Sequence, residues 1–109
     1  MDKRVLGQIG ENAAADVLRA KGYRILRQNY RCRYGEIDII AEKYGEMSFI
    51  EVKTRTADDF GYPADAVDEN KQRKIRRAAD CYLAGRRVMW NNVSLDVMEV
   101  TSNLITDCI

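Results

Sequence analysis

The chain has 109 residues, of which 46% are hydrophobic and 32% charged, the profile of an ordinary soluble domain. This length predicts one domain over residues 1–109, with one core, two layers of secondary structure and no space for a separate cofactor domain. The formal net charge is +1. The chain contains no histidine, and this absence excludes the Ser-His-Asp triad, histidine acid–base catalysis and histidine-ligated metals. Carboxylate, lysine, tyrosine and thiol chemistry remain.

The first half of the chain predicts a helix followed by three strands. Apolar residues recur at three- and four-residue steps over residues 6–21, which is typical of an amphipathic helix, and Gly22 supplies a left-handed stop. Residues 23–28 predict a short first strand, and the polar residues 29–35 predict a loop. Residues 36–41 and 47–54 predict two stronger strands, joined as an antiparallel hairpin by a turn-like segment.

The second half predicts an irregular connection, a second helix and a last strand. Residues 56–66, which include the only proline, predict the connection. Asp68 is the predicted N-cap of a helix that ends at Gly85, with an apolar stripe on one face and basic residues on the other. Residues 93–100 predict the final strand. This order predicts an α/β or α+β sandwich with a mixed sheet, whose last strand lies parallel to a neighbour.

The turn of the hairpin sets which side chains face one another. If residues 44 and 45 are its centre, Asp38 lies opposite Glu51, on the same face as Glu36 and Lys53. Opposed residues have Cβ atoms roughly 4.5 to 5.5 Å apart, so two carboxylates there repel by on the order of 3 kcal/mol. A divalent cation would offset this repulsion, and such oxygen ligands suit Mg²⁺ or Mn²⁺. Lys53 is placed to orient or activate a water, or to neutralise charge developing on phosphorus.

Two other arrangements remain open at this point. A three-residue loop would shift the pairing by one residue and send Asp38 and Glu51 to opposite faces. Alternatively, both acids lie on a solvated face and form ordinary cross-strand salt bridges with Lys53 or Arg55. The predicted metal site therefore depends on the register of the hairpin and on the burial of the two acids.

The charged residues are segregated along the chain. Residues 19–33 contain six basic residues and no acid, and residues 71–87 contain seven basic residues and one acid. The acids concentrate between these segments, in residues 36–51 and 58–69. This pattern fits a polyanionic substrate whose phosphates run on either side of an acidic centre.

The cysteine spacing and the length of the apolar runs indicate in which cellular compartment the protein is expected. Cys32, Cys81 and Cys108 are an odd number at wide spacing, which fits neither a disulfide framework nor a zinc pattern, so we expect free thiols. No apolar run approaches the ~20 residues of a membrane helix, and the first residues lack an apolar segment followed by a cleavage site. We therefore expect a cytoplasmic protein with no membrane partner.

The spacing of the acids resembles a known motif. Asp38 and, after twelve intervening residues, Glu51-Val52-Lys53 resemble the PD-(D/E)XK nuclease superfamily. More closely, the chain resembles the YraN-like family of small bacterial nuclease-like proteins, which is related to archaeal Holliday-junction resolvases. The blocks that carry this resemblance are Gly7 to Glu11 with Ala13 and Ala14, Gly22-Tyr23, Asn29-Tyr30-Arg31, Gly35 to Asp38, Phe49 to Arg55, and Lys71-Gln72. The resemblance implies an α/β fold with a restriction-endonuclease-like core, in which helices flank a central mixed sheet in the order helix, three strands, helix, strand.

The resemblance also implies roles for the residues of the hairpin. Asp38 and Glu51 would bind Mg²⁺ or Mn²⁺, with the carbonyl of Val52 as a further ligand, and Lys53 would take the catalytic role. Glu36 lies on the same predicted face, and its alternative is a structural role as the ion-pair partner of Lys53.

Two residues outside the hairpin match the family pattern as well. Glu11 matches an additional acid that reaches a metal directly or through water, and its alternative is a helix-surface carboxylate. Gln72 matches a polar position near the active centre, and its alternative is a solvated helix residue. In the final strand the family pattern has an Arg-Phe-Asp-Val block where this chain has Ser94-Leu95-Asp96-Val97, so the contacts of that arginine and ring are not carried over.

Basic and aromatic residues are the expected contacts to nucleic acid. The cations expected to bind phosphates are Arg31, Arg33, Arg55, Lys71 and Lys74. Tyr30 and Tyr34 interleave with the arginines, either to stack on an unpaired base or to close the edge of the core. There is no recognition-helix signature, so we expect binding directed by backbone or shape.

The sequence thus predicts a metal-dependent endonuclease that hydrolyses phosphodiester bonds in DNA, with branched or structured DNA as a candidate substrate. One alternative is a nucleic-acid-binding module that keeps the nuclease fold with little or no catalysis. Another is a protein-interaction scaffold whose clustered charge attracts an acidic surface. Similarity to resolvases, which cut two strands, makes a homodimer an expected assembly.

Overall fold

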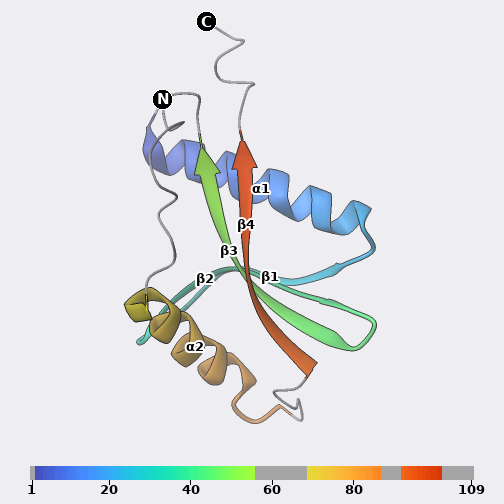
Figure 1. The fold of residues 1–109 in the computed structure, drawn as a ribbon, viewed down its shortest axis with the longest axis vertical. Helices are drawn as coiled ribbons and strands as arrows, with labels where there is room; N and C mark the ends of the chain where they lie inside the picture. The colour runs from blue at the N-terminus through green and yellow to red at the C-terminus, as the bar shows by residue number, and fades with distance from the viewer. Residues whose placement is uncertain (1, 56–68, 87–91, 102–109) are drawn as a thin grey trace, which may run out of the picture.

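The computed structural model describes residues 2–55, 69–86 and 92–101 (Figure 1). In chain order its elements are α1 (Lys3–Ala20), β1 (Arg24–Cys32), β2 (Gly35–Lys43), β3 (Glu46–Arg55), α2 (Glu69–Leu83) and β4 (Val93–Thr101). The strands form one sheet in the order β1-β2-β3-β4. The pairs β1–β2 and β2–β3 are antiparallel, and β4 runs parallel to β3, as the crossover through α2 predicts. The predicted α/β fold with a mixed sheet flanked by helices is confirmed, and it is compatible with a restriction-endonuclease-like core.

The two helices cover opposite faces of the sheet and make two cores. In Figure 1, α1 crosses behind β3 and β4, whereas α2 lies beside β2 on the other face. Residues Ile39 and Ile50 pack with α1, whereas their neighbours Ile40 and Phe49 pack with α2, because successive side chains of a strand point to opposite faces. These side chains are almost completely buried, and each contributes roughly 1.5–3 kcal/mol through removal from water.

Local sequence signals determine both ends of α1. The side chain of Asp2 accepts a hydrogen bond from the backbone N–H of Arg4 at 2.8 Å, which caps the first turn. At the other end Gly22 has a φ of +93°, and the N–H of Tyr23 reaches the carbonyl of Leu18 at 2.9 Å. The predicted stop at Gly22 is confirmed. The helix begins at Lys3, three residues before residue 6, where the apolar pattern predicts its start.

The hairpin of β2 and β3 has the predicted two-residue turn. Tyr44 and Gly45 have φ values of +53° and +76°, the conformation that a type I′ turn requires. Pairing runs from Lys43 opposite Glu46 to Ile39 opposite Ile50 without a shift. The alternative with a three-residue loop is therefore wrong.

The first strand is longer than its sequence predicts. The sequence predicts a loop from residue 29, yet β1 continues to Cys32 and pairs Tyr30 with Ile37 of β2. Pairing with β2 outweighs the weak strand propensity of this polar segment, and Tyr30 gains an edge-to-face contact with Tyr82 of α2 at 5.3 Å between ring centroids. Asn29 keeps a positive φ of +55° within the strand.

The remaining predicted boundaries have mixed outcomes. Helix α2 ends at Leu83, two residues before Gly85, and β4 matches the predicted last strand to within one residue. The predicted connection 56–66, the N-cap Asp68 and the thiol of Cys108 lie outside the described residues. Cys32 and Cys81 are free thiols, as expected. Within the described ranges, neither helix is long and apolar enough to cross a membrane.

Candidate functional site

The site lies where β2 and β3 stop pairing. Their regular pairing ends at Ile39 opposite Ile50. One residue further, Asp38 Oδ2 accepts a hydrogen bond from the backbone N–H of Val52 at 2.7 Å, and its carboxyl group interacts with that of Glu51. A side chain thus replaces the next main-chain hydrogen bond of the hairpin, which holds Asp38 against β3. The predicted juxtaposition of Asp38 and Glu51 is present.

Both acids are largely withdrawn from solvent. Only 14% of the Glu51 side chain is exposed. Burial raises the pKa of Asp38, against the hydrogen bond from Val52, which lowers it. Burial and then the charge of Asp38 raise the pKa of Glu51, whereas Lys71 and Lys53 lower it. The interpretation as exposed cross-strand salt bridges does not describe this pair.

A third acid reaches the site from α1. Glu11 is only 5% exposed, so it is not the helix-surface carboxylate that the sequence left open. Burial and then the charge of Asp38 raise its pKa to about 6, against hydrogen bonds from the Gln28 side chain and the Asn29 backbone. Within the described residues, Glu11 Oε1 has no hydrogen-bond partner. Buried carboxylate oxygens are normally paired, so this oxygen is available for a ligand.

A close contact between α1 and β3 brings Glu11 into the site. A Cβ atom on Gly10 would lie 1.9 Å from Thr54 Oγ1, so only glycine permits this approach of the helix to the strand. Sequence analysis did not identify Gly10 as a packing residue. A signal existed, because a glycine inside a helix costs about 1 kcal/mol relative to alanine and so points to a packing reason.

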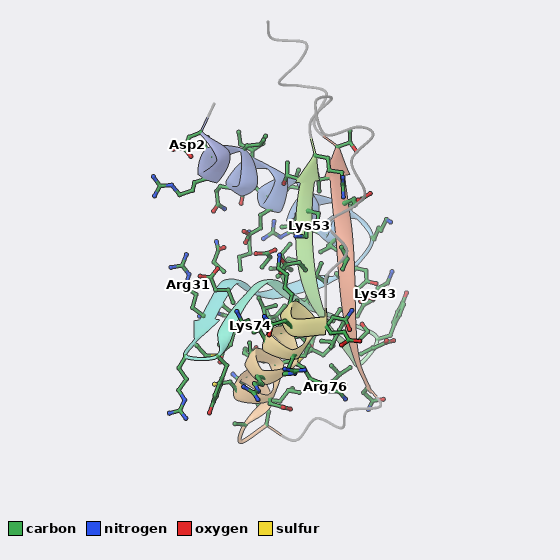
Figure 2. The ribbon with its side chains drawn as sticks, turned by 60° about the vertical axis from the view of Figure 1, so that its left-hand side comes forward. Asp2, Arg31, Lys43, Lys53, Lys74 and Arg76 are labelled. Atoms are coloured by element: carbon green, nitrogen blue, oxygen red, sulfur yellow. The ribbon has the colours of Figure 1, made fainter. Side chains whose placement is uncertain are left out.

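Two lysines accompany the acids. Lys71 Nζ, from α2, lies 3.4 Å from Glu51 Oε1 and also interacts with Asp38 and Lys53. Lys53 lies on β3, at a level between α1 and α2 in Figure 2, and interacts with Glu51 and Lys71. Sequence analysis assigned Lys71 to phosphate binding and did not foresee its pairing with Glu51, since residues 51 and 71 come together only through the packing of α2.

The donor set fits a small, hard cation. Within the part of the chain that the structure describes, no group of three His, Cys, Asp or Glu side chains converges as a complete ligand set. Mg²⁺ commonly binds through one or two carboxylates and keeps several waters. Asp38 and Glu51 supply such a pair, the main chain of Val52 lies against Asp38, and the unpaired oxygen of Glu11 suits a contact through water.

The other predicted residues surround this centre at different positions. Gln72 is exposed and lines a groove of about 480 Å³ between α2 and β4, together with Phe49 and Val97. Arg55 forms an ion pair across β3 and β4 with Glu99 at 2.7 Å.

The turn between β1 and β2 carries a second group of cations and an exposed ring. Arg31 pairs with Glu36 at 3.3 Å, so Glu36 has a partner on β1. Arg33 lies over the ring of Tyr34, with its guanidinium carbon 4.9 Å from the ring centroid. Lys74 is exposed on α2, and its Cβ would lie 3.5 Å from a Cβ on Gly35. Tyr34 therefore remains accessible beside α2, whereas Tyr30 packs against the core, as its structural alternative predicts.

Comparison with known proteins identifies the family. Residues 10–100 match the family described as "Uncharacterised protein family UPF0102". A UPF0102 protein of Moorella thermoacetica is 48% identical over 100 residues, which cover 92% of this chain and 83% of that protein. A UPF0102 protein of Caldanaerobacter subterraneus subsp. tengcongensis is 43% identical over 103 residues, which cover 94% of this chain and 84% of that protein. A UPF0102 protein of Mycobacterium sp. strain KMS is 46% identical over 100 residues, which cover 90% of this chain and 74% of that protein. The chain therefore belongs to the UPF0102 family, the YraN-like family that its motifs resemble.

Proposed function

We propose that this protein is a metal-dependent nuclease that hydrolyses phosphodiester bonds in DNA. The observation that carries the proposal is the half-buried, adjacent pair of Asp38 and Glu51 at the point where β2 and β3 separate. Two carboxyl groups withdrawn from water in direct contact destabilise the fold unless a cation joins them. A structural sheet has no need for such a pair.

Each residue of the site has its own proposed role. Asp38 and Glu51 would hold Mg²⁺ or Mn²⁺, with the carbonyl of Val52 as a further ligand and Glu11 acting through water. When bound, the ion would supply Lewis-acid stabilisation of charge on the phosphate. Val52 orients Asp38 by its hydrogen bond.

Lys53 completes the proposed chemistry. It lies on the same strand as Glu51 and its charge acts on that carboxyl group (Figure 2). From there its ammonium group orients an attacking water or compensates negative charge that develops on phosphorus. Gln72, at the first turn of α2, is a candidate to position the substrate.

Cations beside the site support a nucleic acid as the substrate. Lys71 of α2 pairs with Glu51, and Lys74 of the same helix lies beside Gly35 in the turn that follows Arg31 and Arg33. Phosphates that followed these cations would pass the acidic centre, where the ion offsets the repulsion. Such contacts read the backbone and not the base sequence.

The test compares isosteric variants. Asp38→Asn keeps an oxygen that accepts the hydrogen bond of Val52, and Glu51→Gln keeps the shape of the side chain, so both should fold. We expect each to reduce cleavage of labelled single-stranded, duplex or four-way-junction DNA by at least about a hundredfold in Mn²⁺ or Mg²⁺. Wild-type cleavage should stop in EDTA.

Glu46→Gln is the matched control, because Glu46 is exposed at the start of the same strand. It should cleave at the wild-type rate. Undiminished cleavage by Asp38→Asn would refute the assignment. The second candidate function is a nucleic-acid-binding module without catalysis. It is favoured by the ion pair of Lys71 with Glu51, because this pair neutralises one of the two acids. Salt-sensitive binding of every substrate without cleavage would support it.

A further inference from the structure

Lys71 occupies an unusual position for a phosphate-binding residue. Its Nζ atom lies 3.4 Å from Glu51 Oε1, and it also interacts with Asp38, so it contacts the acids and not only the solvent. The two partners differ in exposure, since 44% of the Lys71 side chain is exposed but only 14% of that of Glu51. The carboxylate is therefore held in place, whereas the lysine has room to leave it.

We propose that Lys71 is an exchangeable counter-ion, which pairs with Glu51 in the metal-free protein and transfers to a substrate phosphate when a divalent cation binds. This inference rests on the proposed function, because it assigns a second role to the same site. It connects metal binding with substrate binding through one side chain.

Electrostatics favours the exchange. A divalent cation held by Glu51 would be close to the Lys71 ammonium group, because Lys71 Nζ lies 3.4 Å from Glu51 Oε1. The two positive charges would repel, and both would compete for Glu51. Lysine has a flexible four-carbon stem and three donors, so it can reorient without movement of α2.

Phosphate is the natural new partner. Once Glu51 is engaged by the cation, the ammonium group beside the centre no longer has its counter-charge, and a phosphate oxygen supplies another. Lys74, three residues along α2, lies at the turn of β1 and β2 beside Gly35 and therefore takes no part in this exchange. Figure 2 shows Lys53 on β3 and Lys74 on α2 as separate positions.

The exchange predicts opposite effects of one substitution on two ligands. Lys71→Met removes the competing charge, so Mn²⁺ alone should bind about tenfold more tightly, as measured by calorimetry without DNA. The same variant should bind a four-way-junction oligonucleotide less tightly in the presence of Mn²⁺. A lysine that served only as a structural partner of Glu51 and never contacted phosphate would not weaken DNA binding when it is removed.

Two matched variants make the result specific. Lys74→Met removes the same charge from the same helix and should leave the affinity for Mn²⁺ within about twofold, since that charge is more distant and screened. Lys71→Arg keeps the positive charge and should keep the weaker, wild-type affinity. Thermal unfolding of each variant checks that it is folded.

The outcomes separate this inference from the proposed function. If the wild type binds Mn²⁺ and Lys71→Met binds it no more tightly, the counter-ion role is wrong while the metal site stands. If neither protein binds Mn²⁺, both the metal site and the exchange are wrong. Tighter binding of Mn²⁺ by Lys71→Met but not by Lys74→Met, together with weaker binding of DNA by Lys71→Met, supports the exchange.

Discussion

Burial raises the pKa of Glu11 to about 6 because its charged form is withdrawn from water and faces the charge of Asp38. In the unfolded chain the same group has a pKa of about 4.5. The folded protein therefore binds more protons than the unfolded chain between these values. Above pH 6 the charged, buried Glu11 lowers the free energy of unfolding. This destabilisation disappears as the pH falls from about 6 to 4.5, because the carboxyl group becomes protonated in the folded protein.

This difference predicts the behaviour of Glu11→Gln. Without metal, the variant should be more stable than the wild type by about 1–2 kcal/mol at pH 8, since an amide has no charge to bury. The advantage should vanish near pH 4.5, where the wild-type carboxyl no longer has to be buried in its charged form. Urea denaturation at several pH values measures it. A stability difference that does not change between pH 4.5 and 8 would contradict the assignment, and the exposed Glu46→Gln should show no such trend.

Helix α1 contains two glycines that differ in their surroundings, and only Gly10 contacts β3. A Cβ on Gly10 would collide with Thr54 Oγ1 at 1.9 Å, whereas a Cβ on Gly7 would meet nothing within 4 Å. Both residues lie in the same helix. They form a matched pair in which helix propensity is equal and packing is not.

Gly10→Ala should therefore destabilise the protein by about 1–3 kcal/mol through overpacking. Gly7→Ala should stabilise it by about 0.5–1 kcal/mol, because alanine favours the helix. Denaturant unfolding of both variants tests this pair. The double variant Gly10→Ala/Thr54→Ala should recover part of the stability, since it removes the nearest atom. Equal effects of the two glycine substitutions would show that the contact with Thr54 is unimportant.

The same contact links an element to the site. Glu11 follows Gly10 directly, so any displacement of α1 moves Glu11 away from Asp38. The hairpin works in the same way, because the two-residue turn at Tyr44 and Gly45 sets the register that brings Asp38 to Glu51. Helix and hairpin thus each position one part of the acidic centre.

Across the molecule, one group of cations lies where α2 meets the β1–β2 turn. The turn between β1 and β2, with Arg33, lies against α2 at Lys74. The C-terminal end of α1 lies on the other side of the molecule (Figure 1), and the carbonyl of Lys21, which follows it, accepts a hydrogen bond from Lys43 next to the β2–β3 turn. The proposed DNA path therefore involves the first group and not the second.

Salt dependence tests this distribution of charge. For the double variant Arg33→Gln/Lys74→Gln, the slope of log K against log salt for DNA binding should be less steep than the wild-type slope by about 2, one unit for each phosphate that is no longer neutralised. The control Arg19→Gln/Lys21→Gln removes the same charge at the far end of α1 and should keep the wild-type slope. Fluorescence anisotropy of labelled DNA between about 50 and 200 mM salt measures both. An equal decrease of slope in the two variants would indicate non-specific attraction instead of a defined path.

Local chemistry accounts for the parts of the fold that the sequence predicts correctly. The positive φ values at Gly22 and Gly45 follow from residue type, and runs of apolar and β-branched residues on either side of a turn predict β2 and β3. The extension of β1 to Cys32 is not predicted because its polar residues have no strand pattern of their own. They pair only because β2 lies beside them.

The amino-acid sequence by itself determined the order of the elements and placed the hairpin turn near residues 44 and 45, since these depend on contacts between near neighbours, whereas the structure fixed the register that brings Asp38 to Glu51. Only the tertiary structure decided that Glu11 is buried and that Lys71 pairs with Glu51. Both depend on how closely α1 and α2 approach the sheet, and that distance is set by packing between segments far apart in the chain. Charge and burial at the site are therefore properties of the assembled layers.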